Sequence, residues 1–382
     1  MTTNTVSAPP DLGRIGFSEE QASLLDVATV FCREQSPTAK VRRLMEDELG
    51  HEPSVWRAIV ELGWLGVAIP ETFGGAGLGL AEVVPLMEQM GRTLLAGPFA
   101  SATLAAQALL AGGTQGQQQA WLPKLATGTV VTLGLVEPGG DWDLARIFCE
   151  ATEADGGRLA LSGRKVLVGD AAAAEAIIVS VLWRGRPALV LVDTAALPAG
   201  ALRREVVIDE TRRAYALNLT GVEVSRGSLL DPDRAGAALA HIHLAANLLA
   251  AAEMCGGTQA VIDYTVDYAR TRKQFGQPIG AYQGVKHPLV EAYVRYEQAR
   301  SHLYAAAHCF AEQGTGEIAT RMAKATADQA FAFASDRAIQ FHGGFGFTYD
   351  CDAQLYRRRA IWHASQYGDA AYHRKKLAEL LL

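Results

Sequence analysis

The order of its segments most constrains how this 382-residue chain can fold: helical patterns come first and last, and strand-like runs lie only in the middle. Between residues 131 and 225, runs such as AIIVSVLW and PALVLVDT are rich in apolar and β-branched residues and are separated by Gly, Pro, Asp and Asn. They predict a compact antiparallel β-domain. Because the blocks are segregated rather than alternating, they favour three domains over a βαβ fold.

The flanking regions carry apolar residues at the three- and four-residue spacing of amphipathic helices. After Asp231-Pro232, three segments are long enough to be bundle helices: 233–272, 281–312 and 316–341. The predicted fold is mainly α with a β-domain. Its three parts are an N-terminal helical domain (1–130), a middle antiparallel β-domain (131–225) and a C-terminal helical bundle (226–382).

Composition excludes several classes of function. A net charge of −6 gives no electrostatic reason to expect nucleic-acid binding. The five cysteines are scattered without a CxxC pair, which suits a reducing cytoplasm and argues against disulfides and a zinc site. The N-terminal MTTNTVSAPPDLG lacks the features of a signal peptide, and apolar windows such as Ala171 to Trp183 are too short to span a bilayer. We therefore expect a soluble cytoplasmic protein that binds no membrane.

The stretch Tyr268 to His287, YARTRKQFGQPIGAYQGVKH, combines a basic cluster with an aromatic residue where a long helix ends. Arg272 and its basic neighbours could simply complement the partial negative charge of the helix C-terminus. Followed by Phe275 and a Gly-Gln-Pro break, the same turn could hold a pyrophosphate and pack an adenosine.

A second motif, Gln340-Phe341-His342-Gly343-Gly344-Phe345-Gly346, ends the last long helix. Its three glycines could merely terminate that helix. They could also let backbone amides approach a pyrophosphate, because a Cβ atom would fill the space that the ligand needs.

Both motifs resemble those of the acyl-CoA dehydrogenases, as do IPETFGGAGLGLAEV and MEQMGRTLLAGPF in the N-terminal region, so the resemblance covers essentially the whole chain. It implies a helical domain, a β-domain and a four-helix bundle, with FAD as cofactor and an acyl-CoA thioester as substrate. In that family the matching Arg and Phe reach the FAD of a neighbouring subunit. The resemblance implies these cofactor-binding residues: Arg272, Phe275, Gln283, Gln340, His342, Gly343, Gly344 and Gly346.

The position of the catalytic base departs from the family. The reaction removes an α-proton with a carboxylate shielded from water and transfers a β-hydrogen as hydride to the flavin. Counting without gaps places Tyr367 at the position of the usual Glu, and a phenol is a poor base at neutral pH. Some relatives carry the base on the preceding long helix, where Ala246 stands here. Neither position supplies a carboxylate, so no catalytic residue is assigned.

Two nearby acids could substitute for the missing Glu. Glu253 lies two turns after Ala246, and we expect it to face elsewhere. Asp369 follows Tyr367 by two residues and is shorter than Glu. Each could equally be a surface or structural charge.

The pocket for the flavin ring is also altered. By resemblance, Val136 replaces a hydroxyl donor and Trp142 replaces a small Ser, while Leu167 and Gly169 stand where a Trp shields the flavin and a Thr binds it. A pocket without these donors leaves polar flavin edges unpaired, at roughly 1–3 kcal/mol each.

These losses predict that two different subunits supply different parts of one active site. The chain keeps the residues that serve a neighbour's cofactor and lacks its own base and ring pocket. It resembles the base-less subunit of heteromeric dehydrogenases of bacterial steroid side-chain or dicarboxylyl-CoA degradation. A homologous partner would supply the Glu in an α2β2 assembly, with an electron-transfer flavoprotein as acceptor. Two alternatives stay open: a self-sufficient homotetramer that uses Asp369, and a flavin-free scaffold subunit.

Overall fold

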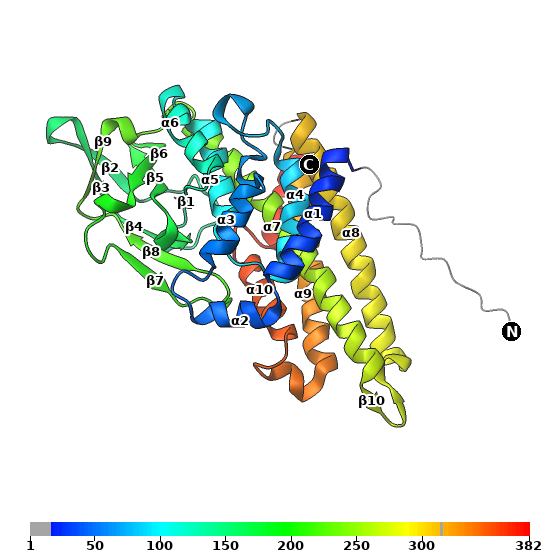
Figure 1. Cartoon of the computed structure of the whole chain (residues 1–382). Helices are drawn as coiled ribbons and strands as arrows, with labels where there is room; N and C mark the ends of the chain where they lie inside the picture. Colours follow the sequence, from blue (N-terminus) through cyan, green and yellow to red (C-terminus); the bar gives the residue numbers. More distant parts are fainter. Residues whose placement is uncertain (1–16, 314–315) are drawn as a thin grey trace.

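The computed structural model describes residues 17–313 and 316–382, with only the backbone of 311–313, so the N-terminal MTTNTVSAPPDLG segment lies outside the described residues. Figure 1 shows strands gathered at one side of the molecule and long helices at the other. The predicted succession of helices, strands and helices is confirmed. The N-terminal helices are α1 (Glu19–Gln35), α2 (Thr38–Glu46), α3 (Pro53–Glu61), α4 (Leu80–Thr93), α5 (Phe99–Gly112) and α6 (Gln115–Ala126).

Nine strands of the middle region form two sheets. They are β1 (Val131–Gly134), β2 (Glu150–Ala154), β3 (Arg158–Ser162), β4 (Arg164–Gly169), β5 (Ala176–Trp183), β6 (Arg186–Asp193), β7 (Leu202–Glu205), β8 (Ala214–Asn218) and β9 (Val222–Ser225). The larger sheet has the order β1-β5-β2-β3-β9 with β6 also paired to β5, and the smaller has the order β4-β8-β7.

The larger sheet is mixed, so the prediction of a purely antiparallel domain was wrong in this detail. Strands β1 and β2 both pair in parallel with β5, and the other pairs are antiparallel. The connection from β1 to β5 includes three other strands, which is ample length for a parallel crossover. Sequence periodicity does not report strand direction, because the side chains alternate in both arrangements.

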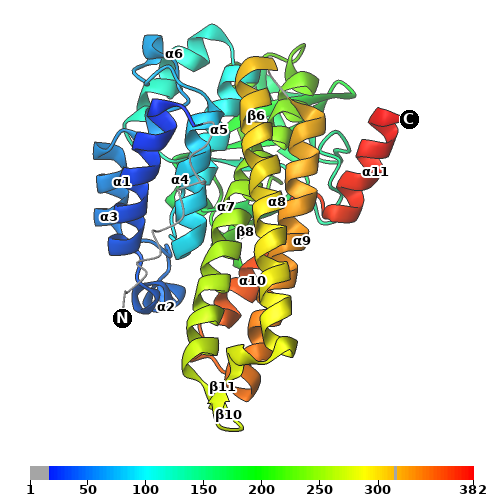
Figure 2. The same cartoon turned by 90° about the vertical axis from the view of Figure 1, so that its right-hand side faces the viewer.

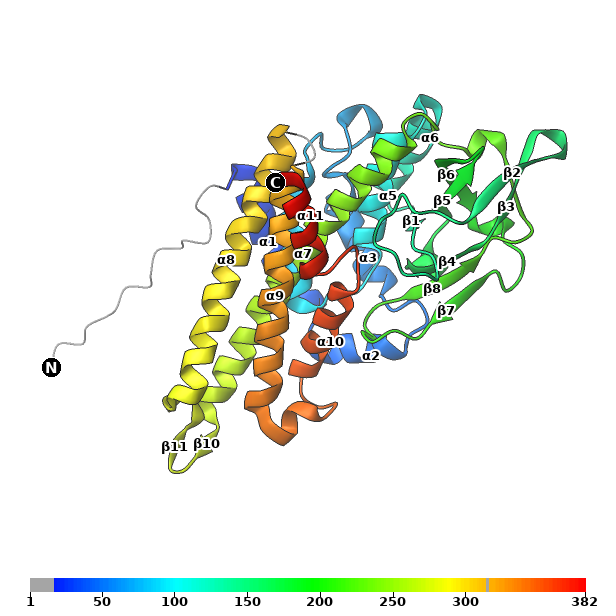
Figure 3. The same ribbon diagram turned by 180° about the vertical axis from the view of Figure 1, so that it is seen from behind.

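The C-terminal helices match the predicted segments closely. They are α7 (Ala235–Thr271), α8 (Gln283–Gln313), α9 (Glu317–His342), α10 (Ala353–Ala364) and α11 (Ala370–Leu381). Figure 2 shows α7, α8 and α9 side by side, with a short hairpin of β10 (Lys273–Gln274) and β11 (Gln277–Pro278) at one end. From behind, α10 and α11 flank α9 between the bundle and the sheets (Figure 3).

Helix α7 is the centre of the helical core. Its residues are buried along most of its length, and α4 crosses it closely. A Cβ atom at Gly256 would lie 1.8 Å from the Glu88 carbonyl oxygen, so only glycine permits this approach. By length and composition α7 is the one described helix that could cross a membrane, which the sequence interpretation did not note; 78% of its most apolar window is buried in the protein. Burial of this kind is typical of a core helix.

Candidate functional site

The hairpin between α7 and α8 presents the basic cluster and its aromatic residue. Arg272 caps the end of α7, and Phe275 and Gly276 form the two-residue loop between β10 and β11, both with positive φ (50° and 84°). A left-handed conformation favours Gly and is strained for Phe. The Phe275 ring is 94% exposed, so the hairpin holds a large apolar ring in solvent at a cost in backbone strain.

A cavity of about 570 Å³, here called the bundle-tip cavity, joins the two predicted motifs. It brings together four of the predicted cofactor-binding residues: Arg272, His342, Gly343 and Gly344. Its other lining residues are Tyr268, Gln274, Ile279, Phe341 and Phe345. The hairpin and the turn after α9 therefore lie side by side, although some seventy residues separate them in sequence.

The remaining predicted residues do not line this cavity. Phe275 projects from the hairpin, and Gln283 and Gln340 are exposed, at the start of α8 and in the last turn of α9. Gly346 is buried, and a Cβ atom there would lie 2.4 Å from the Ile339 carbonyl oxygen. That glycine is required for packing, whatever the cavity binds.

The wall of the bundle-tip cavity combines open backbone with a stacked histidine ring. Gly343 adopts φ 61° and ψ −140°, and Cβ atoms at Gly343 or Gly344 would meet nothing within 4 Å, so backbone there is open to a ligand. The His342 ring stacks on Tyr268 at 4.2 Å between centroids, and its Nδ1 lies 2.8 Å from the Ala338 carbonyl oxygen. Burial lowers the pKa of His342, so the ring is neutral and donates through Nδ1. Its Nε2 has no hydrogen-bond partner among the described residues.

A second cavity, the inner cavity, has a volume of about 130 Å³ and lies between the middle strands, α7 and α10. The two family positions for the base, Ala246 and Tyr367, both line it, as do Leu167 and Gly169 at the positions of the altered ring pocket. The structure thus brings these four positions together. Burial raises the pKa of Tyr367 to about 12, which makes it a still poorer base at neutral pH.

Glu253 also lines the inner cavity, so the expectation that it faces elsewhere was wrong. Glu253 follows Ala246 by seven positions, which is almost two turns of 3.6 residues and returns the side chain to the same face of the helix. The Glu253 carboxylate is nevertheless engaged by the guanidinium groups of Arg212 and Arg359. Burial alone would raise the pKa of Glu253. The two cations outweigh this effect and hold that pKa well below its usual range. A carboxylate so neutralised is a weak base.

The partners of Glu253 form a buried network that joins distant parts of the chain. Arg359 of α10 also binds Asp209 and Thr211 in the loop between β7 and β8, and the His363 ring lies 3.3 Å from Glu253. The sequence interpretation missed this network, because its members lie far apart in sequence and carry no motif.

Asp369 lies away from the inner cavity and has a structural task. Its side chain accepts a hydrogen bond of 2.8 Å from the Tyr372 amide and caps α11.

Asp170, which the sequence interpretation did not consider, does line the inner cavity and accepts a 2.7 Å hydrogen bond from the Ser101 hydroxyl. Burial raises the pKa of Asp170. Its place beside the altered Gly169 was the signal that could have drawn attention to it.

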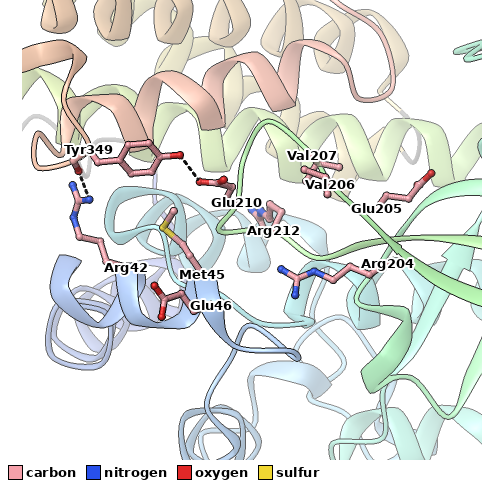
Figure 4. Close-up of a pocket in the computed structure, with 10 residues that line it drawn as sticks. All are labelled: Arg42, Met45, Glu46, Arg204, Glu205, Val206, Val207, Glu210, Arg212 and Tyr349. Carbon is pink, nitrogen blue, oxygen red and sulfur yellow. Dashed lines mark hydrogen bonds between the residues drawn. The ribbon is translucent and has the colours of Figure 1, made fainter.

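A groove of about 720 Å³ lies on the other side of Arg212 from the inner cavity. Figure 4 shows Arg42 and Glu46 of α2 on one side, the segment after β7 on the other, and Tyr349 at one end, with its hydroxyl 3.3 Å from Glu210. Charges of both signs line the groove, so it favours neither an anion nor a cation. Arg212 lines both spaces and is held by Glu253.

Comparison with known proteins gives matches along most of the chain. A family model described as "Acyl-CoA dehydrogenase, N-terminal domain" matches residues 18–129, and one described as "Acyl-CoA dehydrogenase, C-terminal domain" matches residues 237–382. The acyl-CoA dehydrogenase IpdE2 of Mycobacterium tuberculosis is 31% identical over 345 residues, which cover 90% of this chain and 91% of that protein.

Solved structures agree in fold over almost the full length. A structure described as a variant of the Tcur3481-Tcur3483 steroid ACAD matches with a TM-score of 0.85 and 31% identity, covering 95% of this chain and 98% of that one. The ChsE4-ChsE5 complex of Mycobacterium tuberculosis matches with a TM-score of 0.86 and 26% identity, covering 96% and 98%.

Proposed function

Because the chain belongs to the acyl-CoA dehydrogenase family, whose members are FAD-dependent oxidoreductases, we propose that it is the base-less subunit of a heteromeric acyl-CoA dehydrogenase. A homologous partner supplies the catalytic Glu and the flavin-ring pocket. One observation carries the proposal: the cavity where the family places its base holds Ala246 and Tyr367, and the nearby Glu253 is neutralised by two arginines.

In this proposal the bundle-tip cavity holds the adenosine and pyrophosphate end of a flavin whose ring lies in the partner. Arg272 provides positive charge for the pyrophosphate, and the open backbone at Gly343 and Gly344 allows close approach. The exposed Phe275 ring offers an apolar surface to the adenosine or to the partner. Bound flavin supplies the acceptor for the β-hydride, and the base that takes the α-proton belongs to the partner.

The volumes of the bundle-tip cavity and the inner cavity support the proposal that this chain holds only one end of the flavin. Ligand pockets usually have volumes of about 300–1,000 Å³. The bundle-tip cavity, at about 570 Å³, falls in that range, whereas the inner cavity, at about 130 Å³, lies below it. The names of the ChsE4-ChsE5 complex and of the Tcur3481-Tcur3483 steroid ACAD support a two-component enzyme and a steroid-derived acyl group. We further propose an α2β2 assembly in the cytoplasm with an electron-transfer flavoprotein as acceptor.

Co-expression with the partner subunit tests the proposal. The wild-type complex should contain one FAD per heterodimer and oxidise its acyl-CoA, and the chain purified alone should contain almost none. Arg272→Ala should lower the affinity of the complex for FAD at least tenfold. Arg270→Ala is the matched control, because Arg270 is an exposed neighbour that does not line the bundle-tip cavity, and it should retain flavin.

Two results would reject the proposal. If the chain alone binds a full complement of FAD and oxidises an acyl-CoA, it is a self-sufficient dehydrogenase. If Arg272→Ala leaves both flavin content and activity of the complex unchanged, the chain is a scaffold that does not touch the cofactor.

A further inference from the structure

Trp142 connects the middle β-domain to the segment that follows α10. It lies in the loop between β1 and β2, and its indole N–H donates a 3.0 Å hydrogen bond to the Ser365 carbonyl oxygen. Its ring also meets the Tyr372 ring edge to face, with centroids 5.5 Å apart. The side chain therefore bridges two domains.

The segment that Trp142 holds, residues 363–369, is fixed from the helical side as well. The Lys324 ammonium donates to the carbonyl oxygens of His363 and Gly368 at 3.1 and 2.7 Å, and His243 Nε2 lies 3.0 Å from the Tyr367 carbonyl oxygen. Gly368 has φ 106°, and a Cβ atom there would lie 2.3 Å from the Tyr372 ring. With contacts to α7, α9 and the β-domain, the segment keeps Tyr367 at the wall of the inner cavity.

An outer cavity of about 300 Å³ is lined by Trp142, His243 and Tyr372 among others. His243 and Ala246 lie one turn apart on α7, yet the first lines the outer cavity and the second the inner one. Among the described residues, none lines both cavities. The His243–Tyr367 contact joins one residue of each wall. Trp142, in the wall of the outer cavity, is bonded to Ser365, which directly precedes Gln366 and Tyr367 of the inner wall.

We propose that Trp142 acts as a latch: its contacts with Ser365 and Tyr372 keep the inner cavity apart from the outer one. This division closes the chain's own cleft, by which we mean the two cavities taken together. The inference rests on the proposed function, which it deepens: the flavin ring and the acyl thioester are kept out of this subunit's own cleft and directed to the partner's site. The small Ser that the family carries at this position could neither reach Ser365 nor pack on Tyr372. Replacing Trp142 removes one hydrogen bond and one aromatic contact and leaves the bonds from Lys324 and His243 to the segment in place.

Thiol accessibility measures whether the cleft is closed. Ala246→Cys places a thiol in the wall of the inner cavity, and the co-expressed heteromer is treated with methyl methanethiosulfonate while labelling of that peptide is followed by mass spectrometry. We expect slow labelling with Trp142 present. Adding Trp142→Ser should accelerate labelling at least tenfold.

Trp56→Ser is the matched control, because the Trp56 indole also donates a 3.0 Å hydrogen bond to a carbonyl oxygen, that of Gly128, and neither residue lines the inner or the outer cavity. It should leave the labelling rate unchanged. Trp142→Phe keeps an aromatic ring for Tyr372 but has no donor, and it should give an intermediate rate even if the Ser variant fails to assemble. Rapid labelling with Trp142 in place, or equal rates in all variants, would overturn the latch. Neither result depends on flavin content, which tests the proposed function separately.

Discussion

At the scale of single residues, the surroundings of a carboxylate decide whether it can act as a base. Glu253 and Asp170 both line the inner cavity, but their pKa values shift in opposite directions. Two guanidinium groups stabilise the ionised form of Glu253, whereas burial without a direct cationic partner disfavours the ionised form of Asp170. Position in the inner cavity alone therefore does not make Glu253 a good base, because its pKa is held low.

Replacing Glu253 should destabilise the fold. Glu253→Gln removes the carboxylate shared by Arg212 and Arg359 and leaves buried positive charge without full compensation. We expect the free energy of unfolding to fall by about 3 kcal/mol, measured by urea denaturation followed by circular dichroism. The control Glu379→Gln, which removes an exposed partner of Lys376, should leave the urea midpoint unchanged. Equal midpoints for both variants would show that the network contributes nothing to stability.

At the scale of structural elements, the hairpin after α7 carries a conformational cost that packing within this chain does not explain. Phe275 is strained and almost fully exposed, and its nearest aromatic neighbour, Tyr282, lies 6.4 Å away between centroids. Strained residues of this kind persist where function requires their placement. The element is thus shaped for contact with something outside this chain.

Substitution of Phe275 should change the stability of the chain and its retention of FAD in opposite directions. Asn tolerates a left-handed conformation better than Phe, so Phe275→Asn should raise the free energy of unfolding of the isolated chain by about 1 kcal/mol. The same variant should lower FAD retention by the heteromer. Phe148→Asn, at an exposed Phe of the β-domain, is the control and should retain FAD. A stabilised variant that keeps its flavin would remove Phe275 from the proposed site.

At the scale of the whole molecule, the C-terminal helices pack around histidines that burial keeps uncharged. His243 of α7 and His373 of α11 stack 6.2 Å apart beside Arg321 and Lys324. Burial, then nearby cations, lowers the pKa of His243 to about 4 and that of His373 to about 3. The packing of α11 against α7 and α9 therefore depends on neutral histidines.

Stability should consequently fall in mild acid. Both folded pKa values lie below the unfolded value of about 6.5, so between pH 6.5 and 4 the unfolded chain binds protons that the folded chain does not. The free energy of unfolding should decrease by up to about 1.4 kcal/mol per pH unit for each histidine as the pH falls. Urea midpoints at pH 7, 6 and 5 test this, and His373→Asn should flatten the slope. An unchanged slope would mean that other groups control acid stability.

Segregated patterns of hydrophobic residues were sufficient to predict the order of the domains, and α7, α8 and α9 follow the predicted segments because each helix repeats its own local period. The two glycine- and arginine-containing motifs likewise predicted Arg272, His342, Gly343 and Gly344 as parts of one site, since each motif is a continuous turn. The assignment of these residues to FAD and the domain boundaries stay predictions.

Only the tertiary structure decided which acids line the inner cavity and which side chains connect distant segments. Asp209, Glu253 and Arg359 meet through three separate elements, and Trp142 reaches Ser365 across two domains. Such contacts depend on how the elements pack, and the pKa of a buried group depends on the charges that packing places beside it. The sequence by itself pointed to the family and to the altered positions of the base, because both lie in continuous motifs, whereas the packing determined that the cavity at those positions is small and that Glu253 in its wall is neutralised by two arginines.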